Sequence, residues 1–92
     1  AIVDGPLALD VAISPEACEI KGLVSPVGGA ADILIFPNIE AGNVFYKSAT
    51  YLAGGRLAGV VFGTKAPCVL TSRADDEESK YLSIALACLL SA

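Results

Sequence analysis

The fold class follows from residues 32–47, whose sequence is DILIFPNIEAGNVFYK. Residues 32–36 form a short apolar run that ends at Pro37, which is typical of a strand buried on both faces of a parallel sheet. Apolar side chains then recur at helical spacing until Gly54-Gly55, at Ala41, Val44, Phe45, Ala49 and Leu52. We therefore predict a strand over residues 32–36 and a helix over about residues 39–53.

The same alternation continues on both sides of this stretch. Two further apolar strands are predicted over residues 57–62 and 68–71, and a last helix from near Asp75 to the end. On the amino-terminal side of residues 32–47, residues 7–13 have helical character. A second helix is predicted to start at Ser14-Pro15-Glu16 and to end at Gly22. Residues 25–29 are predicted as a loop. The expected α/β architecture is a mostly parallel sheet flanked by helices.

The length and the amino-acid composition exclude several classes of protein. The chain has 92 residues, enough for one small domain and not for two. Hydrophobic residues make up 54% and charged residues 17%, which is too apolar for a disordered segment. No apolar run reaches about 18 residues, so we expect no membrane span, and the first residues lack the pattern of a secretory signal. The absence of methionine favours a piece of a longer protein.

The charge and the reactive side chains narrow the chemistry. The net charge is −4, but four acids lie together at residues 75–78, and six dispersed bases make no patch for a nucleic acid. Cys18, Cys68 and Cys88 are far apart and set among apolar neighbours, so we expect buried free thiols in a reducing cytoplasm and no metal site. Since the chain has no histidine, chemistry is left to carboxylates, hydroxyls, Lys, Arg and backbone amides.

Ligands of such folds bind beyond the carboxyl ends of the strands, here residues 37–38, 63–64 and 72–73. Arg73 follows a predicted strand and precedes a helix, and a guanidinium beside free helix N–H groups suits a phosphate. Ser72 can orient an attacking or leaving group through its hydroxyl. The alternative is that Ser72 caps a turn and Arg73 pairs with the acids that follow. Gly63 is predicted as a turn glycine, and Lys65 as a residue that can reach a phosphate.

The acidic run and the predicted helix over residues 39–53 each have two interpretations. Asp75-x-x-Glu78 resembles a capping box, which is structural, whereas the functional alternative makes one acid a general base that deprotonates a thiol. On the helix, Glu40, Asn43 and Lys47 share one face, which makes them candidates for a binding site. The alternative is that this face is a solvated surface with one salt bridge. Asn38 lies in the turn before this helix and can cap it. Gly42 is costly inside a helix and so indicates a close approach by backbone or ligand.

Four segments recur in order and spacing in one family: PNIEAGN at residues 37–43 with Tyr46-Lys47, residues 59–63, residues 65–67, and LTSRAD at residues 70–75. They resemble the carboxyl-terminal part of the phosphate acetyltransferase and phosphate butyryltransferase family. The resemblance extends from about Asp4 to the end of the chain. It is closer to the butyryltransferase branch, whose motifs include DGPLALD, NIEAGN and TSRAD.

The resemblance implies the reversible reaction acyl-CoA plus phosphate giving acyl phosphate plus coenzyme A, with a short acyl group such as butyryl or acetyl. It implies a two-domain α/β enzyme related in fold to the isocitrate and isopropylmalate dehydrogenases, with substrates in the cleft between domains. Residues 1–92 would be a single segment of its carboxyl-terminal part. It further implies coenzyme A as a substrate and a homo-oligomer of two or more subunits. The reaction requires no metal and no tightly bound cofactor, and the free cysteines favour a cytoplasmic location.

The resemblance also assigns roles to residues. Ser72 would be the catalytic serine and Arg73 the phosphate-stabilising arginine. The acetyltransferase branch carries its proposed base where this sequence has Ser79, so we assign Asp75 as the catalytic candidate, with Asp76, Glu78 or a residue outside the chain as alternatives. A motif that lines the cleft matches Asn38, Gly42, Asn43, Tyr46 and Lys47.

Three other hypotheses stay open. A metal- and NAD-dependent dehydrogenase of the related fold would need spaced metal-binding carboxylates, whereas the acids at residues 75–78 are contiguous. A non-catalytic segment could complete a sheet or an oligomer interface. A butyryltransferase-type sequence could also be joined to an enoyl-CoA hydratase partner.

Overall fold

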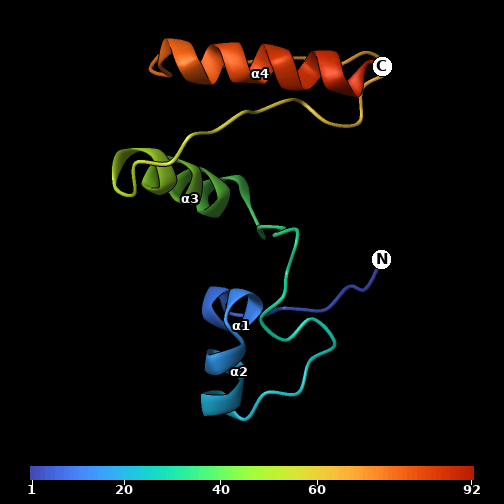
Figure 1. The fold of residues 1–92 in the computed structure, drawn as a ribbon, viewed down its shortest axis with the longest axis vertical. Helices are drawn as coiled ribbons and strands as arrows, with labels where there is room; N and C mark the ends of the chain where they lie inside the picture. The colour runs from blue at the N-terminus through green and yellow to red at the C-terminus, as the bar shows by residue number, and fades with distance from the viewer. The chain divides into compact units, whose positions relative to one another are not determined.

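The computed structural model describes residues 1–92 and contains four helices, in two units that comprise Ala1–Phe36 and Pro37–Ala92 (Figure 1). The first unit holds α1 (Leu9–Ile13) and α2 (Pro15–Lys21). The second holds α3 (Ile39–Tyr51) and α4 (Glu77–Leu90). No helix is long and apolar enough to cross a membrane.

The ends of α2 confirm the local signals in the sequence. The Oγ of Ser14 accepts a hydrogen bond from the N–H of Ala17 over 3.2 Å, and Pro15 occupies the first helical position. Gly22 ends the helix in the left-handed region, at φ 62°, where a residue without Cβ is favoured. Because each signal acts within three or four residues, the sequence alone is sufficient to predict this helix.

The first unit has a small core where α1 packs against α2. Val11, Ala12 and Cys18 are its buried apolar side chains, and the Sγ of Cys18 donates to the carbonyl of Val11 over 3.0 Å. The predicted loop is confirmed, and its Gly29 lies so close to α2 that an added Cβ would collide with the backbone of Pro15. The glycine is therefore required by this close approach and by its φ of 83°.

The two helices of the second unit are capped by side chains that precede them. The Oδ1 of Asn38 accepts from the N–H of Ala41 over 2.8 Å, which confirms Asn38 as the cap of α3. For α4, the cap is Asp76, whose Oδ1 accepts from the N–H of Ser79 over 2.7 Å. The predicted capping box that starts at Asp75 is therefore wrong by one residue, and the helix begins at Glu77.

The predicted parallel sheet is wrong, because the structure contains no β-strand. The backbone is irregular over residues 32–36, 57–62 and 68–71, apart from one antiparallel bridge between Val61 and Cys68. In this bridge the N–H of Val61 donates to the carbonyl of Cys68 over 2.8 Å. A single bridge is far short of a ladder, so the chain consists of four helices joined by irregular segments.

Connection length explains part of this correction. Residues 63–67 separate the second and third predicted strands, whereas parallel strands need a crossover of about a dozen residues or more. These two segments can therefore meet only in antiparallel fashion, as the bridge does. The first predicted strand is not formed, and its Ile33 and Ile35 are exposed rather than buried between neighbours.

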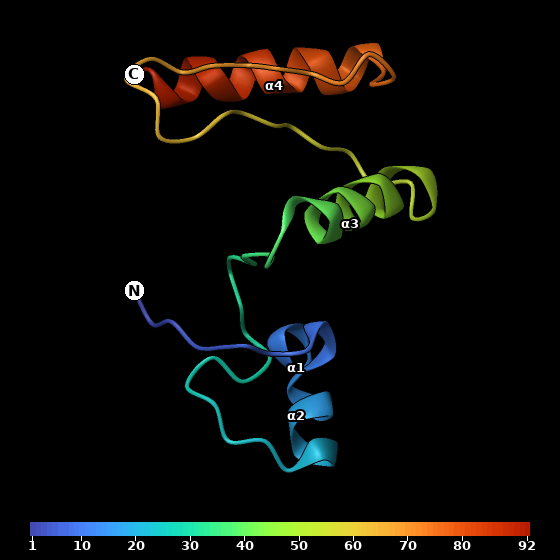
Figure 2. The ribbon, with the colours of Figure 1, turned by 180° about the vertical axis from the view of Figure 1, so that it is seen from behind.

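The connection between α3 and α4 makes two passes alongside α4, first toward its carboxyl-terminal end and then back to its start (Figures 1 and 2). One hydrogen bond fixes the first pass, since the N–H of Gly59 donates to the Oγ of Ser83 over 3.0 Å. The same hydroxyl donates to the carbonyl of Ser79 over 2.7 Å. Ser83 is thus a buried polar link between the connection and the helix.

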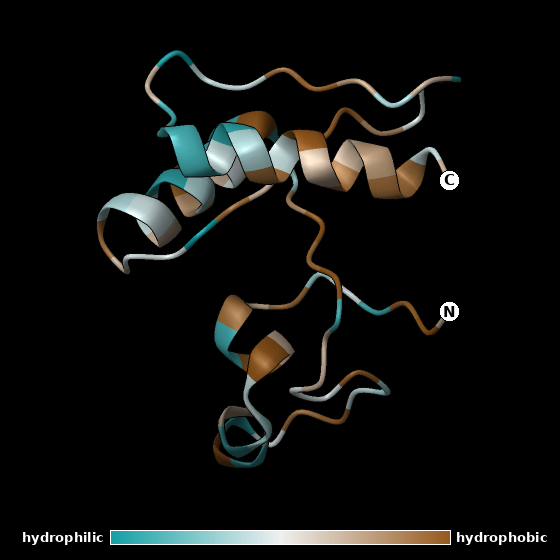
Figure 3. Cartoon of the chain, turned by 45° about the horizontal axis from the view of Figure 1, so that its top comes forward, coloured by the Kyte–Doolittle hydropathy of each residue, from teal (hydrophilic) through white to brown (hydrophobic).

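Much apolar surface is left uncovered. Figure 3 shows a hydrophilic start of α4, a hydrophobic carboxyl-terminal half, and hydrophobic stretches along the connections. On the connection between α3 and α4, Phe62 is 90% exposed and Leu70 is 86% exposed. The cysteines follow the same trend: all three are free, as predicted, but only Cys18 is buried, and the predicted burial of Cys68 and Cys88 is wrong in this chain.

Candidate functional site

The candidate site is a tight turn over residues 72–75, between the irregular segment and the start of α4. The N–H of Asp75 donates to the carbonyl of Ser72 over 3.1 Å, which closes the turn. The N–H of Ser72 donates to the Oδ2 of Asp75 over 2.9 Å, and the Oγ of Ser72 accepts from the N–H of Ala74 over 3.3 Å. Three hydrogen bonds therefore define the backbone on which Arg73 is presented.

Arg73 lies at the exposed corner of this turn and forms no ion pair. The alternative that it pairs with the acids that follow is therefore not found, whereas Ser72 does cap the turn. Of those acids, Glu78 pairs instead with Arg56, with 3.0 Å between Nε and Oε1. The guanidinium of Arg73 is thus available to an anion from solvent, next to the amino-terminal end of a helix of 14 residues.

The carboxylate of Asp75 joins this turn to α3. Tyr46 donates its hydroxyl to Asp75, with Oη at 3.3 Å from Oδ1 and 3.2 Å from Oδ2. The Nζ of Lys47 lies 3.7 Å from Oδ1, and the Asp75 side chain is only 11% exposed. We call these four residues, Tyr46, Lys47, Ser72 and Asp75, the Asp75 cluster.

The electrostatics of the cluster follow from burial and charge. Desolvation raises the pKa of Tyr46 above its ordinary 10.0, and the negative charge of Asp75 and the hydrogen bond to it raise the pKa further. The phenol therefore stays protonated and keeps donating at neutral pH. The Nζ of Lys47 lies 4.9 Å from the centre of the Tyr46 ring, so the cation contacts both the ring face and the carboxylate.

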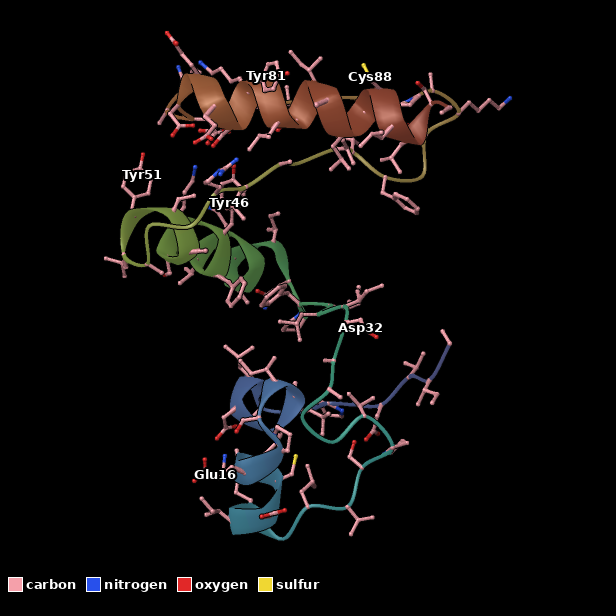
Figure 4. All side chains as sticks on the ribbon, in the orientation of Figure 1. Glu16, Asp32, Tyr46, Tyr51, Tyr81 and Cys88 are labelled. Atoms are coloured by element: carbon pink, nitrogen blue, oxygen red, sulfur yellow. The ribbon has the colours of Figure 1, made fainter.

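The cluster was only partly predictable. Figure 4 shows Tyr46 on the side of α3 that faces the connection to α4, whereas Tyr81 and Cys88 project from the far side of α4. Tyr46 and Lys47 belong to the predicted cleft motif, and Asp75 to the acidic run, but their contact spans 29 residues. No local signal in the sequence fixes a contact at that separation.

Two other acids of the run, Asp76 and Glu78, also have partners. The pKa of Asp76 is lowered from its ordinary 3.8, first because its carboxylate accepts the backbone N–H of Ser79 and then because of hydrogen bonding to the Ser79 side chain. Asp76 is therefore occupied as a helix cap, and Glu78 is occupied by Arg56. Beside them lies an open hollow of about 250 Å³, lined by Thr50, Tyr51, Ala74, Asp75, Asp76 and Ser79.

Two of the predicted binding residues share a second hollow on α3. It has a volume of about 300 Å³ and is lined by Asn43, Val44, Lys47, Ser48, Tyr51 and Leu52. Lys47 thus contacts the Asp75 cluster and also lines this hollow. Gly42 is half-buried in the first half of α3, and Glu40 is exposed in its first turn.

The remaining predicted residues lie elsewhere. Gly63 has a φ of 92°, which confirms the turn glycine, and Lys65 is exposed two residues later. The Oγ1 of Thr64 donates to the carbonyl of Ala66 over 2.6 Å and tightens this loop. Figures 1 and 2 show the loop at the carboxyl-terminal end of α4, whereas residues 72–75 precede its other end, so the structure does not bring Gly63 and Lys65 to Arg73.

Comparison with known proteins identifies the family. The family described as phosphate acetyl/butaryl transferase matches residues 1–88. A phosphate butyryltransferase from Clostridium acetobutylicum is 56% identical over 97% of this chain, and a phosphate acetyltransferase from Thermotoga maritima is 57% identical over 94%. The chain is therefore about equally similar to a phosphate butyryltransferase and to a phosphate acetyltransferase.

A solved structure shows that the similarity extends to the backbone fold. The crystal structure of a branched-chain phosphotransacylase from Enterococcus faecalis V583 is 48% identical and covers 91% of this chain, with a TM-score of 0.82. The chain covers 32% of that protein, and it spans about 30% of the length of the curated relatives. With a family match over nearly its whole length and relatives above 50% identity, the chain belongs to the phosphate acetyl/butyryl transferase family.

Proposed function

We propose that this chain supplies the phosphate-binding side of an enzyme that catalyses acyl-CoA plus phosphate giving acyl phosphate plus coenzyme A. The observation that carries the proposal is Arg73, an unpaired and exposed guanidinium at the corner of a turn that three hydrogen bonds define. A planar fork of N–H donors suits the oxygens of a phosphate. Family membership supports this reaction over a dehydrogenase of a related fold.

The reaction needs donors where negative charge develops. In one direction the thiolate of coenzyme A attacks the acyl phosphate carbonyl, a C–S bond forms, the C–O bond to phosphate breaks, and phosphate leaves as an anion. Arg73 binds the phosphate oxygens throughout. Ser72 already accepts the N–H of Ala74 through its Oγ, so its own O–H proton is free to donate to the oxyanion or to the leaving phosphate. In the reverse direction a phosphate oxygen attacks the thioester and the thiolate leaves.

Residues of α3 and of the loop over 63–67 extend the proposed site. Asn43 and Lys47 line one hollow on α3, and Gly42 and Tyr46 lie beside them on the same helix, while Asn38 holds its first turn. Gly63 and Lys65 lie apart from Arg73, so we assign them to a remote part of coenzyme A, whose phosphates are far from its thiol. Coenzyme A is proposed as a substrate, with no tightly bound cofactor.

The chain would contribute one segment, from the carboxyl-terminal part of a two-domain enzyme. Such a segment carries only part of the substrate contacts, because it spans about 30% of the length of its relatives. We propose a cytoplasmic homo-oligomer with a short-chain acyl substrate, and three free cysteines fit a reducing compartment.

The test is a phosphate-dependent thioester assay with the full-length enzyme. Acetyl-CoA, butyryl-CoA and isobutyryl-CoA are supplied in turn with phosphate or arsenate, and the released thiol is measured. We expect release with at least one thioester and none when the oxyanion is omitted. An enzyme that consumes no thioester, or consumes it without phosphate or arsenate, would overturn the proposed function.

A further inference from the structure

The acidic run leaves open how Asp75 takes part in the reaction. We propose that Asp75 is a positioning residue, whose carboxylate holds the turn over residues 72–75 against α3 so that Arg73 meets the phosphate, and that it does not take the proton from the thiol. The inference rests on the proposed function. Its evidence is the set of partners that the carboxylate has in the Asp75 cluster.

Both oxygens of the carboxylate are engaged. Oδ2 accepts the N–H of Ser72 over 2.9 Å and the hydroxyl of Tyr46 over 3.2 Å. Oδ1 lies 3.3 Å from the same hydroxyl and 3.7 Å from the ammonium of Lys47. A general base needs a lone pair aimed at the proton it removes. With three donors around it and a side chain only 11% exposed, this carboxylate has little room for an incoming thiol.

The turn depends on the carboxylate for its attachment. Without it, the N–H of Asp75 still donates to the carbonyl of Ser72, so a turn can persist. However, the N–H of Ser72 then loses its acceptor, and the links to Tyr46 and Lys47 disappear. Arg73, two residues before Asp75, would no longer be fixed relative to α3. A misplacement of about 1 Å in a binding group can cost about 100-fold in rate.

The experiment compares Asp75→Ala and Asp75→Asn in the full-length enzyme. An Asn oxygen can still accept the N–H of Ser72 and the hydroxyl of Tyr46, but a neutral amide cannot act as a base. We expect Asp75→Ala to lower kcat/KM for phosphate about 100-fold and Asp75→Asn to lower it by about 10-fold or less. The acidic limb of the pH–rate profile should persist in both variants.

Two further variants test whether the effect passes through Arg73. In an Arg73→Ala background, adding Asp75→Ala should lower kcat/KM by no more than about 3-fold, since residues that act through one another are strongly non-additive. Tyr46→Phe removes one donor and should lower kcat/KM for phosphate by several fold. The matched control is Tyr81→Phe, whose ring is 71% exposed on α4 and should leave the kinetics unchanged.

The outcomes distinguish failure of the proposed function from failure of the positioning role of Asp75. If the wild-type enzyme is inactive, the proposed function and this inference fall together. If the wild-type enzyme is active but Asp75→Asn is as inactive as Asp75→Ala and both lose the acidic limb, Asp75 is the base and the inference alone is overturned. Wild-type kinetics in Tyr46→Phe, or fully additive losses in the Arg73 and Asp75 double variant, would also overturn it. The Tyr46→Phe result applies even if Asp75→Ala does not fold.

Discussion

At the scale of single residues, Ser72 is the most constrained part of the site. Its N–H, carbonyl and hydroxyl each take part in a hydrogen bond of the turn. Arg73 contrasts with it, since its backbone lies in the same turn while its side chain is exposed and forms no ion pair. A rigid backbone that carries an uncommitted cation is the arrangement that binds an anion with little reorganisation.

Replacement of Arg73 should therefore separate activity from stability. We expect Arg73→Ala to lower kcat/KM for phosphate by about 100-fold to 1000-fold, the typical loss for one preorganised donor. Because the side chain is exposed, the free energy of unfolding should change by less than about 0.5 kcal/mol. The assay is phosphate-dependent thiol release, with thermal unfolding measured in parallel.

The matched control is Arg56→Ala. Arg56 is also an exposed arginine of the second unit, but it pairs with Glu78 near the start of α4. Its loss should leave turnover unchanged, because exposed ion pairs contribute little. Equal activity losses in the two variants would mean that net positive charge matters, and not the position of Arg73.

At the scale of elements, local signals were predicted well and pairing was not. Ser14, Gly22 and Asn38 each act within a few residues of their helix, and all three were assigned to the correct ends. The strands were predicted from apolar runs, yet a strand exists only if a second segment pairs with it. Asp75 was predicted as the start of the capping box, but its carboxylate binds Tyr46 and the N–H of Ser72, and Asp76 caps α4 instead.

Ser83 tests the attachment of the connection to α4. We expect Ser83→Ala to destabilise the protein by about 0.5 to 1.5 kcal/mol, because the hydrogen bond from the N–H of Gly59 to the buried Ser83 hydroxyl is lost. Amide hydrogen exchange at Gly59 should accelerate more than exchange within α4. The control is Ser79→Ala on the same helix, because the N–H and carbonyl of Ser79 form hydrogen bonds that an alanine keeps. Unchanged exchange at Gly59 in the Ser83 variant would contradict this role.

The cap of α4 should respond to pH. The folded pKa of Asp76 lies below its ordinary 3.8, so the cap stabilises the folded state above that value. This stabilisation is lost as the pH falls through the lower, folded pKa. We expect Asp76→Asn, which keeps an acceptor without a charge, to differ from wild type in stability at pH 6 and to approach it in acid. A difference that stays constant over the titration would disprove the linkage.

At the scale of the whole molecule, the chain lacks the buried surface of an independent domain. Val11, Ala12 and Cys18 are its buried hydrophobic residues, all in the first unit, whereas the second unit buries Ser79 and Ser83. Fold class was therefore the least predictable property, because apolar runs indicate burial without specifying what covers them. In these 92 residues the runs stay exposed, and Ile35 is 89% accessible.

The isolated chain should consequently unfold without a sharp transition. Small domains lose their structure cooperatively when a shared core holds the elements together. We expect residues 1–92 alone to give a broad, shallow thermal change in far-ultraviolet circular dichroism and no turnover of thioester. The full-length enzyme, measured alongside, should melt in a steep transition. A sigmoidal melt of the isolated chain would contradict this expectation.

The irregular backbone of residues 32–35 has a practical consequence for handling the chain. The segment has one charged residue, Asp32, and its β-branched Ile33 and Ile35 are exposed and lie outside any β-strand. Short segments of that kind template stacking between molecules, as in amyloid. A lysine at Ile35 would act as a gatekeeper, so that the fragment remains dispersed at concentrations where the native sequence forms fibres.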